Sequence, residues 1–172
     1  MSSKNKFLIS IVFVMAMTAV MLFTEGKSGG EQGIIVKLEL APNIQAVEQL
    51  IAKFDEEHIQ WIRLNTQFDF IFILAYSSLF FFALKNFLEK LKKANPSALL
   101  LSIAFIPGVL DIVENFFILD FLNRDFSTPY FSIYYGCVHV KWGLVGVFVI
   151  LGLVELGRII YEKWSQVDAK TH

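Results

Sequence analysis

Apolar residues dominate four stretches of this chain, and more polar stretches separate them. Each apolar stretch is close to the roughly 20 residues that an α-helix needs to cross the hydrocarbon core of a bilayer. The four predicted spans are residues 7–23, 68–84, 98–119 and 134–156. The third span contains Pro107-Gly108, which predicts a kink at that point. The pattern therefore predicts an all-α fold, a four-helix transmembrane bundle that forms a single integral membrane domain over residues 1–172.

The segment between the first two spans, residues 24–65, carries two further patterns. Apolar residues alternate with others from Ile34 to Leu40, and this period of two predicts one short strand. After Pro42-Asn43, which is a helix-start signal, a stripe at three- and four-residue spacing predicts an amphipathic helix. The stripe consists of Val47, Leu50, Ile51, Phe54, His58 and Trp61. Because the opposite face is acidic, we expect this helix to cap the bundle rather than lie on anionic lipid.

Composition agrees with a membrane location and adds no chemical signature. The chain is 55% hydrophobic, its mean hydropathy is +0.56, and it has 18 phenylalanines against four prolines. With a net charge of −1 and no basic patch with interleaved aromatic residues, it has no signature of a nucleic-acid partner. Cys137 is the only cysteine, and HExxH, GxSxG, P-loop and dinucleotide-binding patterns are absent. Cofactors and catalytic residues stay unknown, and no metal site is predicted.

Positive charges predict the orientation of the spans. The connection at 85–96 has four lysines against Glu89 alone, whereas residues 24–65 have four basic and seven acidic residues. By the positive-inside rule, both termini and this connection are cytoplasmic, and residues 24–65 are extracytoplasmic. The first apolar run resembles a signal peptide, but it ends without a small-residue cleavage pattern. We therefore expect an uncleaved first helix rather than a cleaved signal.

Several polar residues fall inside the predicted spans. A carboxylate at the centre of a span costs roughly 3 kcal/mol on insertion scales, so something must compensate it. Helical spacing places the polar residues of each span on one face. At about 1.5 Å per residue, all of the charged ones lie roughly 5 to 12 Å below the outer boundary. The convergence predicts one site, with the candidate ligand-binding residues Asp69, Tyr76, Asp111, Glu114, Asn115 and Lys141.

The charges in this candidate site do not balance, because three carboxylates face one lysine. A dry site tolerates this only if a carboxyl group is protonated, a cation binds or water enters. Asp111 is the expected partner of Lys141, and Glu114 is the carboxyl group that could stay neutral. A purely structural interpretation stands beside this one. In it, the ion network only locks three helices together, and Asp69 is an interface residue in contact with water.

Two other groups in the fourth span are expected to have only structural roles. His139 lies among small residues and is expected to be a packed histidine rather than a metal ligand. The aromatic residues near the outer end, which include Tyr134 and Trp142, partly match an interfacial belt.

Three short motifs resemble a known group of proteins. They are LELA at 38–41, DFIFILAY at 69–76 and GVLDIVEN at 108–115. In this order they resemble a group of small bacterial four-span integral membrane proteins with a GxxDxxEN-type third helix. The resemblance covers most of residues 34–142. It implies a four-span architecture in the bacterial inner (plasma) membrane, and it implies no particular chemistry.

Three functions are compatible with these observations. The first is a binding or transport-assisting membrane protein whose polar site, in the outer half of the bilayer, holds a small ligand, a cation or a lipid head group. The second is a membrane enzyme that acts on a lipid or isoprenoid, with Asp111 and Glu114 as acid and base and Lys141 as electrostatic stabiliser. The third is a structural subunit of a membrane complex. The expected partners are the lipid bilayer and a small-molecule or lipid ligand, and a homo-oligomer stays open.

Overall fold

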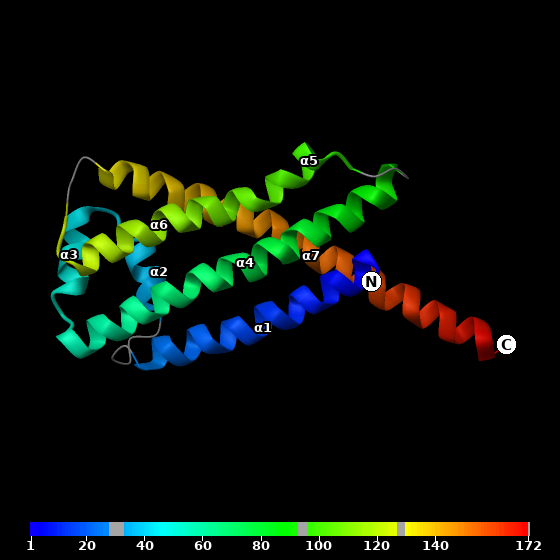
Figure 1. Ribbon diagram of the computed structural model, residues 1–172, viewed down its shortest axis with the longest axis horizontal. Coiled ribbons are helices and arrows are strands. Elements are labelled where there is room, and N and C mark those ends of the chain that lie inside the picture. Colours follow the sequence, from blue (N-terminus) through cyan, green and yellow to red (C-terminus); the bar gives the residue numbers. More distant parts are fainter. Residues whose placement is uncertain (28–32, 93–95, 127–129, 172) are drawn as a thin grey trace.

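The computed structural model describes residues 1–27, 33–92, 96–126 and 130–171, and it is an elongated bundle of helices (Figure 1). The four main helices are α1 (Ser3–Lys27), α4 (Glu56–Lys92), α6 (Ile106–Leu122) and α7 (Phe131–Thr171). Two short helices, α2 (Ile34–Glu39) and α3 (Ile44–Ile51), lie at one end. The short helix α5 (Ala98–Ser102) and a 3-10 turn (Ile103–Phe105) lead into α6. The chain enters α1 and leaves α7 at the end opposite to α2 and α3.

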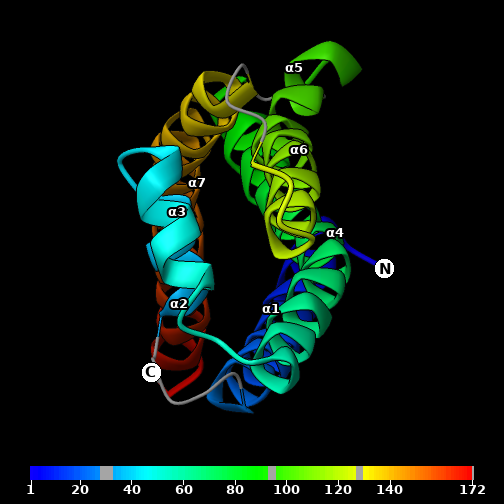
Figure 2. The same cartoon turned by 90° about the vertical axis from the view of Figure 1, so that its left-hand side faces the viewer.

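Within the described residues, four helical stretches are long and apolar enough to cross a membrane. They are Ser3–Lys27, Glu56–Leu91, Ala98–Leu122 and Phe131–Ser165, and each contains one of the predicted spans. The predicted all-α four-helix bundle is therefore confirmed. Figure 2 shows how the helices are arranged when the bundle is seen from the end that carries α2 and α3. Helix α1 packs along α4, which also contacts α6 and α7, and α6 contacts α7.

The predicted strand at 34–40 is wrong, because Ile34–Glu39 forms α2 and no strand occurs in the described parts of the chain. A short apolar run fits both periods, since Ile34 and Leu38 are also four residues apart, and both are buried. A lone strand would leave its backbone groups unpaired, whereas a helical turn satisfies them locally. The helical geometry also places Glu39 on the same face as Ile35.

The predicted amphipathic helix is divided in two. Asn43 caps α3 by accepting a hydrogen bond from the Ala46 N–H at 2.9 Å, as the helix-start signal predicted. The helix then ends at Ile51, and Asp55 starts α4 by accepting from the His58 N–H at 3.0 Å. The buried face of α3 packs on the end of the bundle in one apolar cluster with α2, α6 and α7. The expected capping role therefore belongs to α3 together with α2.

The predicted interruption of the third span is present, but it lies just before the proline. Residues Ile103–Phe105 form a 3-10 turn, and Pro107 occupies the first turn of α6. Proline has no N–H to continue the preceding helix. Gly108 then lets α6 approach α4 closely, because a Cβ there would lie 2.5 Å from Ser77 Oγ. This close approach brings Asp111, one turn further along α6, to the side of α4.

Candidate functional site

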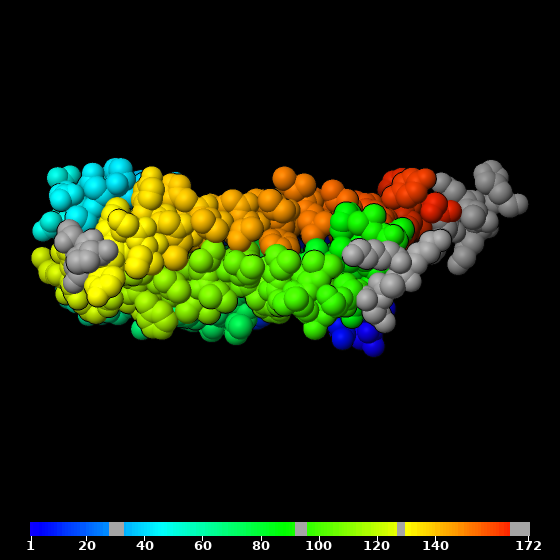
Figure 3. All heavy atoms as spheres, turned by 90° about the horizontal axis from the view of Figure 1, so that it is seen from above, coloured from blue at the N-terminus to red at the C-terminus, as the bar shows by residue number. Residues whose placement is uncertain are grey.

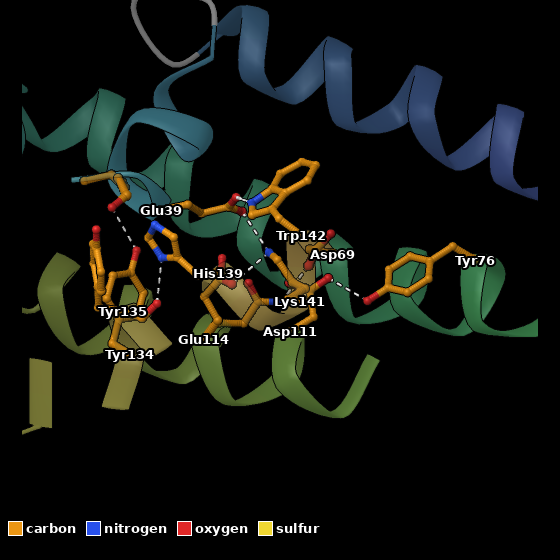
Figure 4. A network of polar contacts seen from close by, with 12 residues as sticks. Glu39, Asp69, Tyr76, Asp111, Glu114, Tyr134, Tyr135, His139, Lys141 and Trp142 are labelled. Atoms are coloured by element: carbon orange, nitrogen blue, oxygen red, sulfur yellow. Dashed lines mark hydrogen bonds and ion pairs between the residues drawn. The ribbon is translucent and has the colours of Figure 1, made fainter. Parts of the chain in front are cut away.

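Lys141 on α7 is the centre of a buried charged network, shown in Figure 4. Its Nζ lies 2.8 Å from Glu114 Oε2, 2.9 Å from Asp111 Oδ1 and 3.2 Å from Glu39 Oε1. All four side chains are buried, and Glu114 is 0% exposed. The Lys141 ammonium donates hydrogen bonds to Asp111 and Glu39, and it forms an ion pair with Glu114. The network joins α2, α6 and α7 through a single side chain.

The second oxygens of these carboxylates have different surroundings. Trp142 Nε1 donates to Glu39 Oε2 at 2.9 Å, and the Tyr76 hydroxyl donates to Asp111 Oδ2 at 2.7 Å. Neither oxygen of Glu114 accepts a hydrogen bond from a described residue, although Oε2 forms the ion pair with Lys141. A buried group without its hydrogen bonds carries a desolvation penalty. Glu114 is therefore the least compensated carboxyl group of the network.

The structure brings all six sequence-predicted residues into one neighbourhood. Asp111, Glu114 and Lys141 are in direct contact, and Tyr76 joins them through Asp111. Asp69 binds the same part of α6, since Asn115 Nδ2 donates to Asp69 Oδ2 at 2.7 Å. No residue of the predicted set lies elsewhere in the bundle.

Sequence reasoning missed two members of the network, Glu39 and Trp142. A strand would place Glu39 on the solvent side, whereas the helical form of α2 turns it towards Lys141. The Tyr134 hydroxyl holds this helix in place by donating to the Leu38 carbonyl oxygen at 2.9 Å. Trp142 matches an interfacial belt in the sequence, but its indole N–H donates to Glu39. No signal in the sequence favours either contact, apart from the alternative four-residue spacing of Ile34 and Leu38.

Two expectations for the fourth span are corrected. Tyr134 is fully buried, so it is a core residue and not part of a belt. His139 is exposed, and its Nδ1 lies 2.8 Å from the Tyr135 carbonyl oxygen, so it is not a packed histidine. The neighbouring glycines, such as Gly143, have no atom within 4 Å of an added Cβ among the described residues. This stripe of α7 therefore makes no close helix contact within the described chain.

The charges at the site are less balanced than the sequence indicated. Adding Glu39 to Asp69, Asp111 and Glu114 makes four carboxyl groups around Lys141 alone. Glu39, Asp111 and Glu114 each place an oxygen within 4.8 Å of the others, a separation compatible with a metal ion. The Lys141 ammonium already lies at hydrogen-bonding distance from all three of them. In this arrangement a tethered cation occupies the position that a metal ion would take.

A cavity of about 300 Å³ lies beside the network, between α1, α4 and α7. Its polar end is formed by Glu39, Asp69, Asp111, Asn115 and Lys141. Further along the bundle its walls become apolar, with Phe72, Leu79, Phe80, Val145 and Val149. Helices α4 and α7 run in the same direction here, so their later residues lie further from the polar end (Figure 1). The cavity is thus polar at one end and apolar along its length.

The cavity opens at the side of the bundle. Trp142 and Val149 line it and are also 43% and 46% exposed, so the opening lies along α7. Val14 on α1 lies on the other side of the cavity. Other exposed side chains on this part of α7, such as Ile150 and Leu153, are large and apolar. An opening of this kind faces the apolar surface of α7 that lipid would cover.

Comparisons with family models, with curated proteins and with solved structures found no match to this chain. The function is therefore inferred from the geometry and charge of the site itself.

Proposed function

We propose that this chain is an integral membrane protein that binds an amphiphile with a cationic head group, such as a long-chain amine, which enters sideways from the bilayer. The observation that carries the proposal is the shape of the cavity. It has carboxylates at one end, apolar walls along its length and an opening beside exposed apolar residues of α7. Ligand cavities of roughly 300 to 1,000 Å³ are typical, and this one is at the lower limit.

Asp69 is the residue proposed to bind the ligand cation. It lines the cavity, and its hydrogen bond comes from the neutral Asn115. It forms no ion pair with any residue that the structure describes, whereas Asp111 and Glu39 both face Lys141. A ligand ammonium beside Asp69 would therefore compensate a carboxylate that the protein leaves without a cation. The attraction would be strong because the surroundings have a low dielectric constant.

The alternative functions receive less support. An enzyme with Asp111 and Glu114 as acid and base needs both groups at the substrate, but Glu114 is not among the residues that line the cavity. A purely structural ion network agrees with the direct contacts of Lys141. It gives no reason for a cavity beside the network, or for an Asp69 on the cavity wall that forms no ion pair within the described chain.

The proposed setting is the bacterial inner membrane, with both termini cytoplasmic and the site in the outer half of the bilayer. The excess of lysine in the 85–96 connection supports this orientation. In a Cys137→Ser background, cysteines introduced at Glu56 and Lys92 should react with an impermeant thiol reagent from opposite sides of the membrane. Reaction of both from the same side would contradict the four-span topology.

The ligand proposal is tested with the purified protein in a mild detergent. Dodecylamine should raise the melting temperature, and dodecanol, which has the same chain and no charge, should not. Asp69→Asn keeps an oxygen that can accept from Asn115 but removes the negative charge, so the effect of the amine should disappear. Asp120→Asn is the matched control, since Asp120 is an exposed carboxylate on α6 away from the cavity.

Two results would contradict the proposal. An equal effect of dodecanol would show that the chain alone is recognised. An undiminished effect of dodecylamine on Asp69→Asn would show that the carboxylate is not used, and the structural interpretation would then be favoured.

A further inference from the structure

A second cavity, of about 390 Å³, lies at the opposite end of the bundle. It is formed where the start of α1, the last turns of α4 and the second half of α7 meet (Figure 1). In the space-filling view of Figure 3, this is the end away from α2 and α3. It shares no residue with the carboxylate site and is independent of the function proposed for that site.

Three buried atoms that can donate hydrogen bonds lie in side chains that line this cavity, and none has a partner among the described residues. They are Ser3 Oγ, Asn86 Nδ2 and Arg158 Nε. Asn86 is only 5% exposed, so water reaches it poorly. Amide and guanidinium N–H groups only donate, and a hydroxyl can donate as well. The missing partner is therefore a hydrogen-bond acceptor, because unpaired buried donors are costly and rare in native proteins.

The charge around the cavity also favours an anion. Lys4, Lys90 and Arg158 line it together with one carboxylate, that of Glu89. All three cations also contact Glu162. Arg158 also pairs with Glu155, and Lys85 pairs with Glu89. Lys6 adds a further positive charge beside Phe82, one turn before Asn86. In this region basic residues exceed acidic ones by five to three.

An apolar groove continues from the cavity. A smaller hollow of about 160 Å³ shares Lys90 and Arg158 with it and is otherwise lined by Phe87, Leu91, Val154 and Glu155. Leu91 and Val154 are 64% and 55% exposed, so they lie on the surface that lipid would cover. An anionic group in the first cavity could therefore be joined to an acyl chain in the second. A free phosphate ion would make no use of this groove.

We propose that this end of the bundle binds an anionic phospholipid, with the phosphate among Ser3, Asn86 and Arg158 and one acyl chain along Leu91 and Val154. The oxygens of a phosphate group can accept from a hydroxyl, an amide and a guanidinium at the same time, and Lys4 and Lys90 stabilise the charge. Basic pockets between transmembrane helices are a known means of binding anionic head groups.

The proposal is tested by thermal unfolding of the full chain in detergent with added lipid. Dioleoylphosphatidylglycerol should raise the melting temperature, whereas dioleoylglycerol, which lacks the phosphate, should not. Glycerol 3-phosphate supplies the same phosphate chemistry without the chains. If it protects as well as the lipid, the site takes a soluble phosphate ester and the lipid proposal is overturned.

Asn86→Leu separates specific binding from diffuse attraction to positive charge, because it changes no charge. Without lipid the variant should be as stable as the parent, since the N–H group of the lost amide has no partner among the described residues. Its affinity for phosphatidylglycerol should fall by roughly tenfold, the effect of losing one hydrogen bond to a charged acceptor.

Ser3→Ala, at the start of α1, provides a second variant that does not disturb the bundle interior. Lys163→Ala, at an exposed position outside the cavity, should keep most of the affinity. Unchanged affinity in both Asn86→Leu and Ser3→Ala would overturn the proposal.

Discussion

Each end of the bundle has a charged cluster in which one charged side chain contacts three of the opposite sign, and the signs are reversed between the two clusters. At the α2 end, Lys141 contacts three carboxylates. At the other end, Glu162 contacts three cations, Lys4, Lys90 and Arg158. The side chains of the first cluster are at most 9% exposed, whereas Glu162 is 29% and Lys90 56% exposed. Coulomb energies rise as the dielectric constant falls. The same excess of one charge therefore costs far more free energy in the buried cluster than in the exposed one.

This difference explains why the two ends favour different ligands. In the buried cluster solvent screens the excess negative charge only weakly, so this charge favours a cation beside it. In the exposed cluster solvent screens most of the excess positive charge. The evidence for an anion there comes instead from a few buried donors without partners, such as Asn86 Nδ2. Charge supports the first proposal beside the shape of its cavity, and hydrogen bonding carries the second.

The largest expected effect is that of Lys141→Met, which removes the central cation of the buried cluster. Three buried carboxylates would lose their common partner, and such a loss costs roughly 3–5 kcal/mol of unfolding free energy. The measurement is equilibrium unfolding, or the melting temperature, in detergent. A second change, Asp111→Leu, should recover part of the loss because it removes one of the unpaired charges. A double variant no more stable than Lys141→Met would contradict a simple ion pair between the two residues.

A smaller effect is expected from Trp142→Phe, which keeps the aromatic ring and removes the donor to Glu39. The loss of this hydrogen bond to a charged oxygen should cost about 1–2 kcal/mol. Glu39 lines the cavity and would keep Lys141 as its one partner among the described residues, so the affinity for dodecylamine should rise. Unfolding with and without the amine measures both effects. No change in stability would indicate that water replaces the indole N–H without loss.

Glu162→Gln is the counterpart of Lys141→Met in the exposed cluster, and it should lower the melting temperature far less. Its three ion pairs are largely solvated, so the loss should shrink further at high salt. A loss as large as that of Lys141→Met, or one independent of salt, would remove the contrast between the two clusters. Thermal unfolding at low and high ionic strength is the measurement.

The smallest effect is expected at Asp55, an exposed residue that belongs to neither cluster. Asp55 accepts a hydrogen bond from the His58 N–H, and this bond lowers the pKa of Asp55 below its usual 3.8. The folded state therefore favours the ionised form, so its contribution to stability is present above pH 3.8 and is lost as the pH falls through the lowered pKa. Asp55→Ala should slightly lower the melting temperature at neutral pH and have no effect in stronger acid. An effect that persists in strong acid would contradict a role for the ionised carboxylate.

Much of the candidate site could be predicted from the sequence, because helical geometry is local. The i, i+3 and i+4 spacing of Asp111, Glu114 and Asn115 is sufficient to place them on one face of a helix. The cost of charges in lipid then requires that this face meets Lys141. Glu39 could not be found in this way. A six-residue segment such as Ile34–Glu39 has apolar positions that fit both a strand and a helix. Only its packing against Tyr134 and the end of the bundle decides between them.

The sequence by itself determined the four apolar helices and the level at which their polar residues meet, since both follow from hydrophobicity and a fixed rise per residue. Only the tertiary structure decided which groups are partnered and which are not. It placed Glu39 and Trp142 at Lys141 and brought Ser3, Asn86 and Arg158 together. It also left Asp69, on the wall of a cavity, without an ion pair to any described residue. The physical reason is that hydrogen bonds and ion pairs depend on distances of a few ångströms between helices distant in the sequence. No periodicity along the chain specifies those distances.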